Sequence, residues 1–215
     1  KITVFALPEV SSATFSPVCI DAPSFTMQDG TPAGGTYSGS GVLNNTFSPS
    51  DAGAGTHQII YSYIDGNSCV NHDTTSITVN DLPDVSLSDI PEFCIDAEPY
   101  ELTEGAPSGG NYSGTGVQNG MFYPENAGAG SHTITYTFTD SNGCTNSDSK
   151  VITVNPLPVV TLEDFPEFCF SSPEYSLTEG NPAGGTYSGK GINNNILNPE
   201  TAGTGEHSIT YTYTD

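Results

Sequence analysis

The sequence predicts an all-β protein in which small β-sandwich modules follow one another in an extended rod. Two observations support this prediction. The chain repeats itself every 75 residues, and each repeat contains short segments in which apolar and polar residues alternate. No apolar stretch keeps helical spacing for long enough to form a helix, so helices are expected to be absent. Frequent Gly and Pro between the segments are typical of turns.

The repeat is visible in marker residues that return at a constant offset without a gap. They are Leu7, Leu82 and Leu157; Cys19, Cys94 and Cys169; Tyr37, Tyr112 and Tyr187; and His57, His132 and His207. Residues 1–6 are then expected to be the last strand of a preceding, truncated module. Three repeats follow over residues 7–81, 82–156 and 157–215, the third truncated at its C-terminus.

The second repeat shows the predicted strands in order. They cover residues 85–87, 100–103, 110–113, one or two strands within 117–123, then 131–139 and 151–154. The longest strand alternates clearly, with His132, Ile134, Tyr136 and Phe138 on one face and threonines on the other. About seven short strands at this spacing indicate an immunoglobulin-like β-sandwich.

The cysteines predict disulfides inside each repeat. Cys19 precedes Cys69 by 50 residues, and Cys94 precedes Cys144 by the same distance, so these are the expected pairs. The partner of Cys169 is expected beyond Asp215. One pair per module is typical of an oxidising, extracellular compartment. Closing a loop of this length would stabilise a small module by about 4 kcal/mol.

Charge and linkers restrict the partners. The chain has 25 acidic residues, three Lys and a net charge of −22. It therefore lacks the positive charge that binding to the phosphates of nucleic acid requires. The linkers at 80–83 and 155–158 are short and contain proline, which predicts little freedom between modules. The expected partners are neighbouring modules and identical chains in a bundle or filament, and membrane contact is expected only through parts outside this segment.

Calcium is the one cofactor that the sequence suggests. This ion prefers several carboxylate and carbonyl oxygens as ligands, and the joints between modules could supply them. The candidate ligands are the repeated Asp65, Asp140 and Asp215, with Asp81 and Asp84 at the first linker. The second linker has Pro156 and Val159 in place of these two acids. The alternative for the repeated aspartates is an Asx turn that needs no metal.

No catalytic residues are predicted, and the chain is not expected to be an enzyme. His57, His132 and His207 share a strand face with Ile and Tyr, which favours a half-buried structural role. The Ser-Gly-Xaa-Gly segments at Ser38, Ser113 and Ser188 lack nucleophile spacing and are interpreted as turns. Paired carboxylates such as Asp164 and Glu167 do not recur in all repeats.

Specific motifs carry a family resemblance over the whole chain. In the second repeat they are Gly-Gly-Xaa-Tyr-Ser-Gly-Xaa-Gly-Val over 109–117, Ala-Gly-Xaa-Gly-Xaa-His-Xaa-Ile-Xaa-Tyr-Xaa-(Tyr/Phe)-Xaa-Asp over 127–140, and Gly143-Cys144. These resemble the immunoglobulin-like repeats of very large Bacteroidota surface proteins, such as gliding-motility adhesins. The resemblance implies type IX secretion, display at the cell surface or in a filament, and a role in adhesion, gliding or prey capture.

Two functions follow from the sequence. The first is a structural stalk or filament segment of a large extracellular bacterial adhesin, used for surface or cell attachment. The alternative is that each module itself binds a glycan or a protein. A binding module needs a concave site or an exposed aromatic cluster, and few aromatic residues depart from the repeat, Tyr123 among them. The stalk is therefore the favoured prediction.

Overall fold

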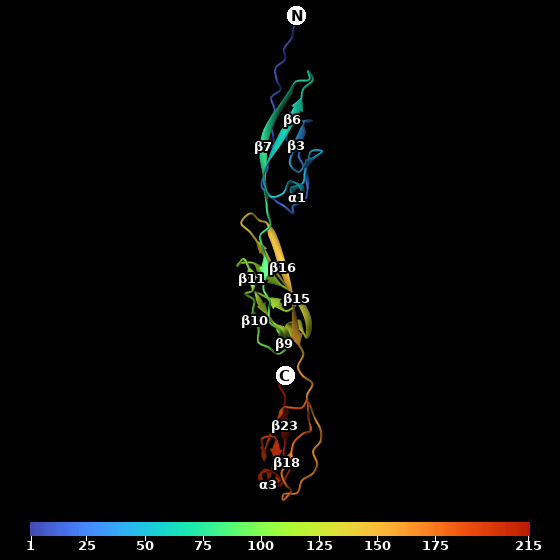
Figure 1. The fold of residues 1–215 in the computed structure, drawn as a ribbon, viewed down its shortest axis with the longest axis vertical. Helices are drawn as coiled ribbons and strands as arrows, with labels where there is room; N and C mark the ends of the chain where they lie inside the picture. The colour runs from blue at the N-terminus through green and yellow to red at the C-terminus, as the bar shows by residue number, and fades with distance from the viewer.

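The computed structural model describes residues 1–215 as a rod of three units in line (Figure 1). Each unit has its own hydrophobic core, and the three cores share no residues. The C-terminus lies at the end of the third unit that faces the second (Figure 1). The predicted fold class is confirmed, because the chain is all-β apart from three single-turn helices.

The first module is a sandwich of two sheets. One sheet has the order β1-β7-β6-β3 and the other the order β2-β5-β4. This grouping of the second, fourth and fifth strands against the third, sixth and seventh is the immunoglobulin arrangement. The strands are β1 (Val18–Cys19), β2 (Phe25–Thr26), β3 (Thr36–Gly39), β4 (Val42–Leu43), β5 (Thr46–Phe47), β6 (Gly55–Ile64) and β7 (Val70–Asn80).

The second module repeats this topology, with sheets β12-β15-β16-β9 and β10-β14-β13 and a small ribbon of β8 and β11. Its strands are β8 (Ser86–Leu87), β9 (Phe93–Cys94), β10 (Tyr100–Glu101), β11 (Gly105–Ala106), β12 (Asn111–Ser113), β13 (Val117–Gln118), β14 (Met121–Phe122), β15 (Gly130–Thr139) and β16 (Thr145–Asn155). Strand β16 begins well before the predicted residue 151, because its polar first half pairs through the backbone without being buried. Strands β9 and β11, of two residues each, were not predicted.

The third module contains β17 (Thr161–Leu162), β18 (Tyr175–Ser176), β19 (Gly180–Asn181), β20 (Thr186–Gly189), β21 (Ile192–Asn193), β22 (Ile196–Leu197) and β23 (Ile209–Thr212). Strand β23 pairs with β20 alone. The corresponding strands of the other modules, β6 and β15, each pair on their second edge with an 11-residue strand. One edge of β23 is therefore unpaired.

The prediction that helices are absent is wrong. Each module has one helical turn: α1 (Pro49–Ala52), α2 (Pro124–Ala127) and α3 (Pro199–Ala202). Proline opens each turn and a glycine with positive φ closes it, at Gly53, Gly128 and Gly203. Four residues are too few to produce a helical period in the sequence, so periodicity could not reveal these turns.

One tyrosine of each module makes the same set of contacts; it is buried in the first two modules and half-buried in the third. The hydroxyl of Tyr136 donates to the carbonyl oxygen of Pro107 and accepts the backbone N–H of Gly110 at 2.7 Å. A Cβ atom on Gly105 or on Gly110 would lie 2.5 Å from the tyrosine ring. The ring thus needs glycine on both sides, which explains the glycine before the Tyr-Ser motif. Tyr61 and Tyr211 make the same contacts in the other modules.

Candidate functional site at the module joint

One disulfide connects the first module to the second. Cys19 of the first module is bonded to Cys144 of the second, with 5.6 Å between their Cα atoms and a sequence separation of 125. The predicted pairs Cys19–Cys69 and Cys94–Cys144 are wrong, because Cys69 and Cys94 are free in the structure, as is Cys169. The predicted stabilisation of each small module by an internal disulfide is therefore also wrong.

The length of one strand explains this correction. Cys19 pairs with Asn80, the last residue of β7, whereas Cys69 directly precedes the first residue of this strand. Eleven strand residues at about 3.3 Å each separate the two cysteines by about 36 Å. A disulfide needs Cα atoms within about 7 Å. Cys94 and Cys144 lie at opposite ends of β16 in the same way.

The two bonded cysteines lie where the modules meet. Cys19 is at the end of β1, beside the point where β7 leaves the first module. Cys144 ends the turn that joins β15 to β16, and this hairpin points towards the first module (Figure 1). Cys144 is 1% exposed, whereas residues 141–143 at the tip of the hairpin are exposed. The first and second modules therefore each carry one cysteine at either end.

Asp140 holds the hairpin in shape. Its Oδ1 accepts the backbone N–H groups of Asn142 and Cys144, both at 2.9 Å. Its own N–H donates to the carbonyl oxygen of Cys144 at 2.9 Å. The hydrogen bonds that the carboxylate accepts, first that from Cys144, lower the pKa of the Asp140 carboxyl. The Asx-turn interpretation is confirmed here, and also at Asp65, whose Oδ1 accepts from Asn67 and Cys69.

Side chains of β16 anchor the segment that enters the second module. The Asn146 side-chain amide donates to the carbonyl oxygen of Pro83 at 2.9 Å. The carboxylate of Asp148 accepts the backbone N–H of Leu87 at 2.8 Å, and this bond is the main cause of its lowered pKa. Lys150 makes a 2.8 Å ion pair with Asp89. The linker is thus held against the strand that begins at the disulfide.

The equivalent contacts recur in the first module, where Asn71 donates to Pro8 and Asp73 accepts from Ser12. Repetition of the anchor in two modules indicates that it belongs to the architecture of the repeat. Sequence reasoning missed Asn71, Asn146, Asp73 and Asp148, although their 75-residue spacing could have pointed to them.

The candidate calcium ligands are not brought together. Asp65, Asp140 and Asp215 lie one in each module, and Asp81 accepts the backbone N–H of its neighbour Leu82. Asp84 is exposed. No group of three or more His, Cys, Asp or Glu side chains is placed to hold a metal ion. Calcium binding stays a prediction.

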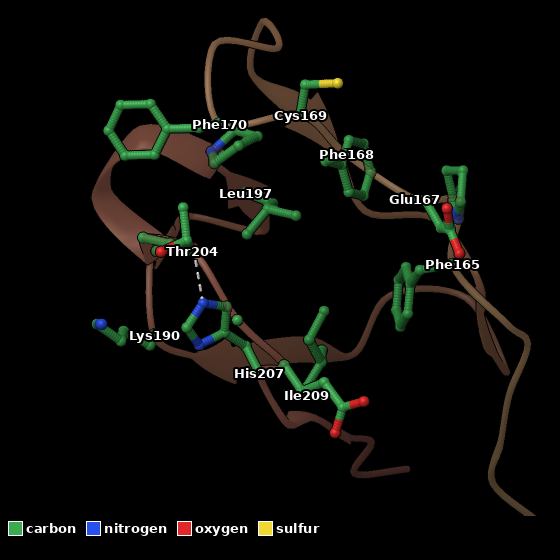
Figure 2. Close-up of a pocket in the computed structure, with 16 residues that line it drawn as sticks. Phe165, Glu167, Phe168, Cys169, Phe170, Lys190, Leu197, Thr204, His207 and Ile209 are labelled. Atoms are coloured by element: carbon green, nitrogen blue, oxygen red, sulfur yellow. Dashed lines mark hydrogen bonds between the residues drawn. The ribbon is translucent and has the colours of Figure 1, made fainter.

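The repeated histidines have a structural role, as predicted. Nε2 of His57, His132 and His207 lies 2.8 Å from the carbonyl oxygen of Gly53, Gly128 and Gly203, respectively. All three rings are half-buried. The rings of His57 and His132 therefore connect the start of the long strand to the glycine that ends the helical turn, and His207 makes the same contact two residues before β23 (Figure 2).

No protein-family model matches the chain, and no curated protein matches it. One similar solved structure is SGBP-B from a Bacteroides ovatus mixed-linkage glucan utilization locus, in complex with a mixed-linkage heptasaccharide. It has a TM-score of 0.25 and 15% identity, over 69% of this chain and 46% of that one.

Another is the cis-dimer of protocadherin gammaB7 EC3-6, with a TM-score of 0.28 and 14% identity, over 81% of this chain and 55% of that one. This chain thus spans about half the length of each. At these TM-scores neither similarity assigns a function to this chain. No helix of the chain is long and apolar enough to cross a membrane.

Proposed function

We propose that this chain is a load-bearing stalk segment of a large extracellular adhesin. The observation that carries the proposal is the Cys19–Cys144 bond, which joins neighbouring modules in addition to the peptide linker. Disulfides persist in oxidising, extracellular environments, which is where an adhesin stalk works. The net charge of −22 would keep such a rod soluble and limit lateral clumping.

The position of the bond matters when the rod is pulled at its ends. Tension that reaches Cys19 can pass directly to Cys144 and along β16 to Asn155, the end of the second module. The residues between the two cysteines form a closed loop that tension cannot extend. The second module would therefore keep most of its fold under a load that unravels an uncrosslinked module.

The larger role is part of the same proposal. The stalk would hold a binding tip away from the cell for surface or cell attachment, in gliding or in prey capture, after type IX export. Support comes from the resemblance of the repeat motifs and from the linear arrangement of the modules (Figure 1).

Single-molecule force spectroscopy, pulling from Lys1 and Asp215, tests the mechanical step. The bond encloses a sequence separation of 125, so at about 3.6 Å per residue the fully stretched oxidised chain should be about 450 Å shorter than the reduced chain. Cys19→Ser should behave like the reduced chain, and Cys69→Ser like the oxidised one. Equal stretched lengths for oxidised and reduced protein would refute the load-bearing role.

Glycan arrays and calorimetry on the same protein test the passive character of the stalk. A stalk segment should give no specific signal. Specific micromolar binding to a glycan or protein would instead establish the alternative, in which each module is itself a binding domain.

A further inference from the structure

The second module departs from the repeat at Gly120. The turn between β4 and β5 has Asn45 as its second residue, and the matching turn of the third module has Asn195, whereas the second module has Gly120 there. The φ angle is 60° at Asn45, 61° at Asn195 and 77° at Gly120. The backbone therefore turns in the same way in all three modules, and the second module lacks only the side chain.

This asparagine has a defined role in the other two modules. Oδ1 of Asn45 accepts the backbone N–H of Tyr37 at 2.7 Å, and its Nδ2 donates to the carbonyl oxygen of Gly35 at 3.4 Å. Asn195 makes the same pair of bonds in the third module, at 2.9 and 3.1 Å. The side-chain amide thus covers two backbone groups at the start of an edge strand, β3 or β20.

The second module has the same two backbone groups but not the amide that covers them. Strand β12 has the same register on β15 as β3 has on β6. The N–H of Tyr112 and the C=O of Gly110 therefore face away from β15. A Cβ atom on Gly120 would meet no other atom within 4 Å. The space that the asparagine amide fills elsewhere is open here.

This open space is part of a hollow of about 370 Å³. Gly110, Tyr112 and Gly120 all line it, and Met121 contributes an apolar wall. The hydroxyl groups of the two tyrosines that line the hollow, Tyr112 and Tyr136, already have hydrogen-bond partners in the module. The hollow therefore offers a ligand one backbone donor and one backbone acceptor.

The direction of these two groups selects the chemistry of the ligand. Both lie on one edge of the same strand, so a ligand must present an acceptor and a donor that point the same way. A primary carboxamide does this with its oxygen and one of its N–H groups. A trans secondary amide points its N–H away from its C=O. A carboxylate has no donor, and it would be repelled by Glu101, the one charged residue that lines the hollow.

We propose that the hollow beside Gly120 binds a primary carboxamide carried by a Gln or Asn side chain of a partner protein. The N–H of Tyr112 donates to the amide oxygen, and the amide nitrogen donates to the carbonyl oxygen of Gly110. The methylene groups of the side chain lie against Met121. The site exists in one module of the three, so it goes beyond the stalk function and gives the stalk a lateral contact point.

NMR titration of the full chain, labelled with nitrogen-15, tests the site directly. The probe is acetamide, which has the same atoms as the asparagine side chain. It should move the Tyr112 N–H signal in a saturable way at millimolar concentrations, and leave Tyr37 and Tyr187 unmoved, because their N–H groups are bonded to Asn45 and Asn195. Acetate and N-methylacetamide should not move Tyr112. No saturable shift with acetamide, or an equal shift with acetate, overturns the proposal.

Two variants locate the binding. Gly120→Asn should abolish the response of Tyr112, because the new side chain fills the hollow as Asn45 does in its own module. The backbone accepts this change, since asparagine already occupies the matching turns with positive φ. Asn45→Gly should create a new acetamide response at Tyr37. If Asn45→Gly unfolds the first module, Gly120→Asn still decides the question. Unchanged acetamide binding in Gly120→Asn overturns the proposal.

Peptides test whether a protein side chain can be the source of the amide. The tripeptide Gly-Gln-Gly, capped with acetyl and N-methylamide groups so that it has no other primary amide, should move the Tyr112 signal. The same capped peptides with Glu or Thr in the middle should not. An equal response to the Thr peptide would indicate strand addition to β12, and it overturns the proposal, as does a silent Gln peptide. Either failure leaves the stalk proposal standing, because that rests on Cys19–Cys144.

Discussion

The side chain of Asp140 accepts the backbone N–H of Cys144 at 2.9 Å, and so positions the sulfur that crosses to Cys19. The first module has the same contact between Asp65 and Cys69, at 2.8 Å, although Cys69 has no disulfide partner. The hairpin tip is therefore arranged for the cross-module bond whether or not the bond has formed. A turn within one module thus prepares the connection between two modules.

Asp140→Ala should speed the reduction of the Cys19–Cys144 disulfide by dithiothreitol. The carboxylate holds the turn that keeps Cys144 at 1% exposure, so its loss should give the reductant access to the sulfur. The rate can be followed on gels after alkylation of the released thiols. Asp65→Ala is the matched control, since it changes the same turn beside a free cysteine, and it should leave the rate unchanged. Equal acceleration by both variants would argue against a local role for Asp140.

Acid should weaken the second module through Asp148. The Leu87 N–H holds the pKa of this carboxyl below its ordinary value. A lowered folded pKa stabilises the module above the unfolded Asp pKa of about 3.9, and this stabilisation is lost as the pH falls through the folded value. In urea titrations, Asp148→Asn should be less stable than wild type at neutral pH and converge with it in acid. The exposed Asp84→Asn should show no such convergence; a constant deficit for Asp148→Asn at all pH values would contradict the assignment.

Gly110→Ala should destabilise the second module by about 1–3 kcal/mol, because overpacking moves side chains and backbone. Its added Cβ would lie 2.5 Å from both the Tyr136 ring and the Thr137 carbonyl oxygen. Gly66→Ala is the control, since a Cβ there meets no atom within 4 Å, and its effect should stay within about 0.5 kcal/mol. Thermal or urea unfolding measures both. A tolerated Gly110→Ala would show that the tyrosine ring can move.

Two neighbours on β16 should respond very differently to truncation. Ile152 is 3% exposed and Val151 is 68% exposed. Ile152→Ala should lower the free energy of unfolding by about 2–5 kcal/mol, since it removes buried methyl groups and leaves a cavity. Val151→Ala should change it by about 0.5 kcal/mol or less. Similar losses from the two variants would mean that β16 does not present its faces as described.

Much of this architecture could be predicted from the sequence. The constant offset between Tyr37, Tyr112 and Tyr187 reveals the module, and alternation reveals the long strand, because both are properties of the chain itself. The Asx turns at Asp65 and Asp140 also depend only on adjacent residues. Single-turn helices such as α1 and two-residue strands such as β9 could not be predicted, since they are shorter than any periodic signal.

The pairing of the cysteines could not be predicted from the sequence. In a repeat, Cys19 precedes one hairpin cysteine, Cys69, and later the next one, Cys144, so spacing along the chain allows either pair. The sequence by itself determined the repeat, the strand faces and the turn around each hairpin cysteine. Only the tertiary structure decided which cysteines meet, because β7 carries the chain about 36 Å away from Cys69 and leaves Cys19 at the joint with the next module.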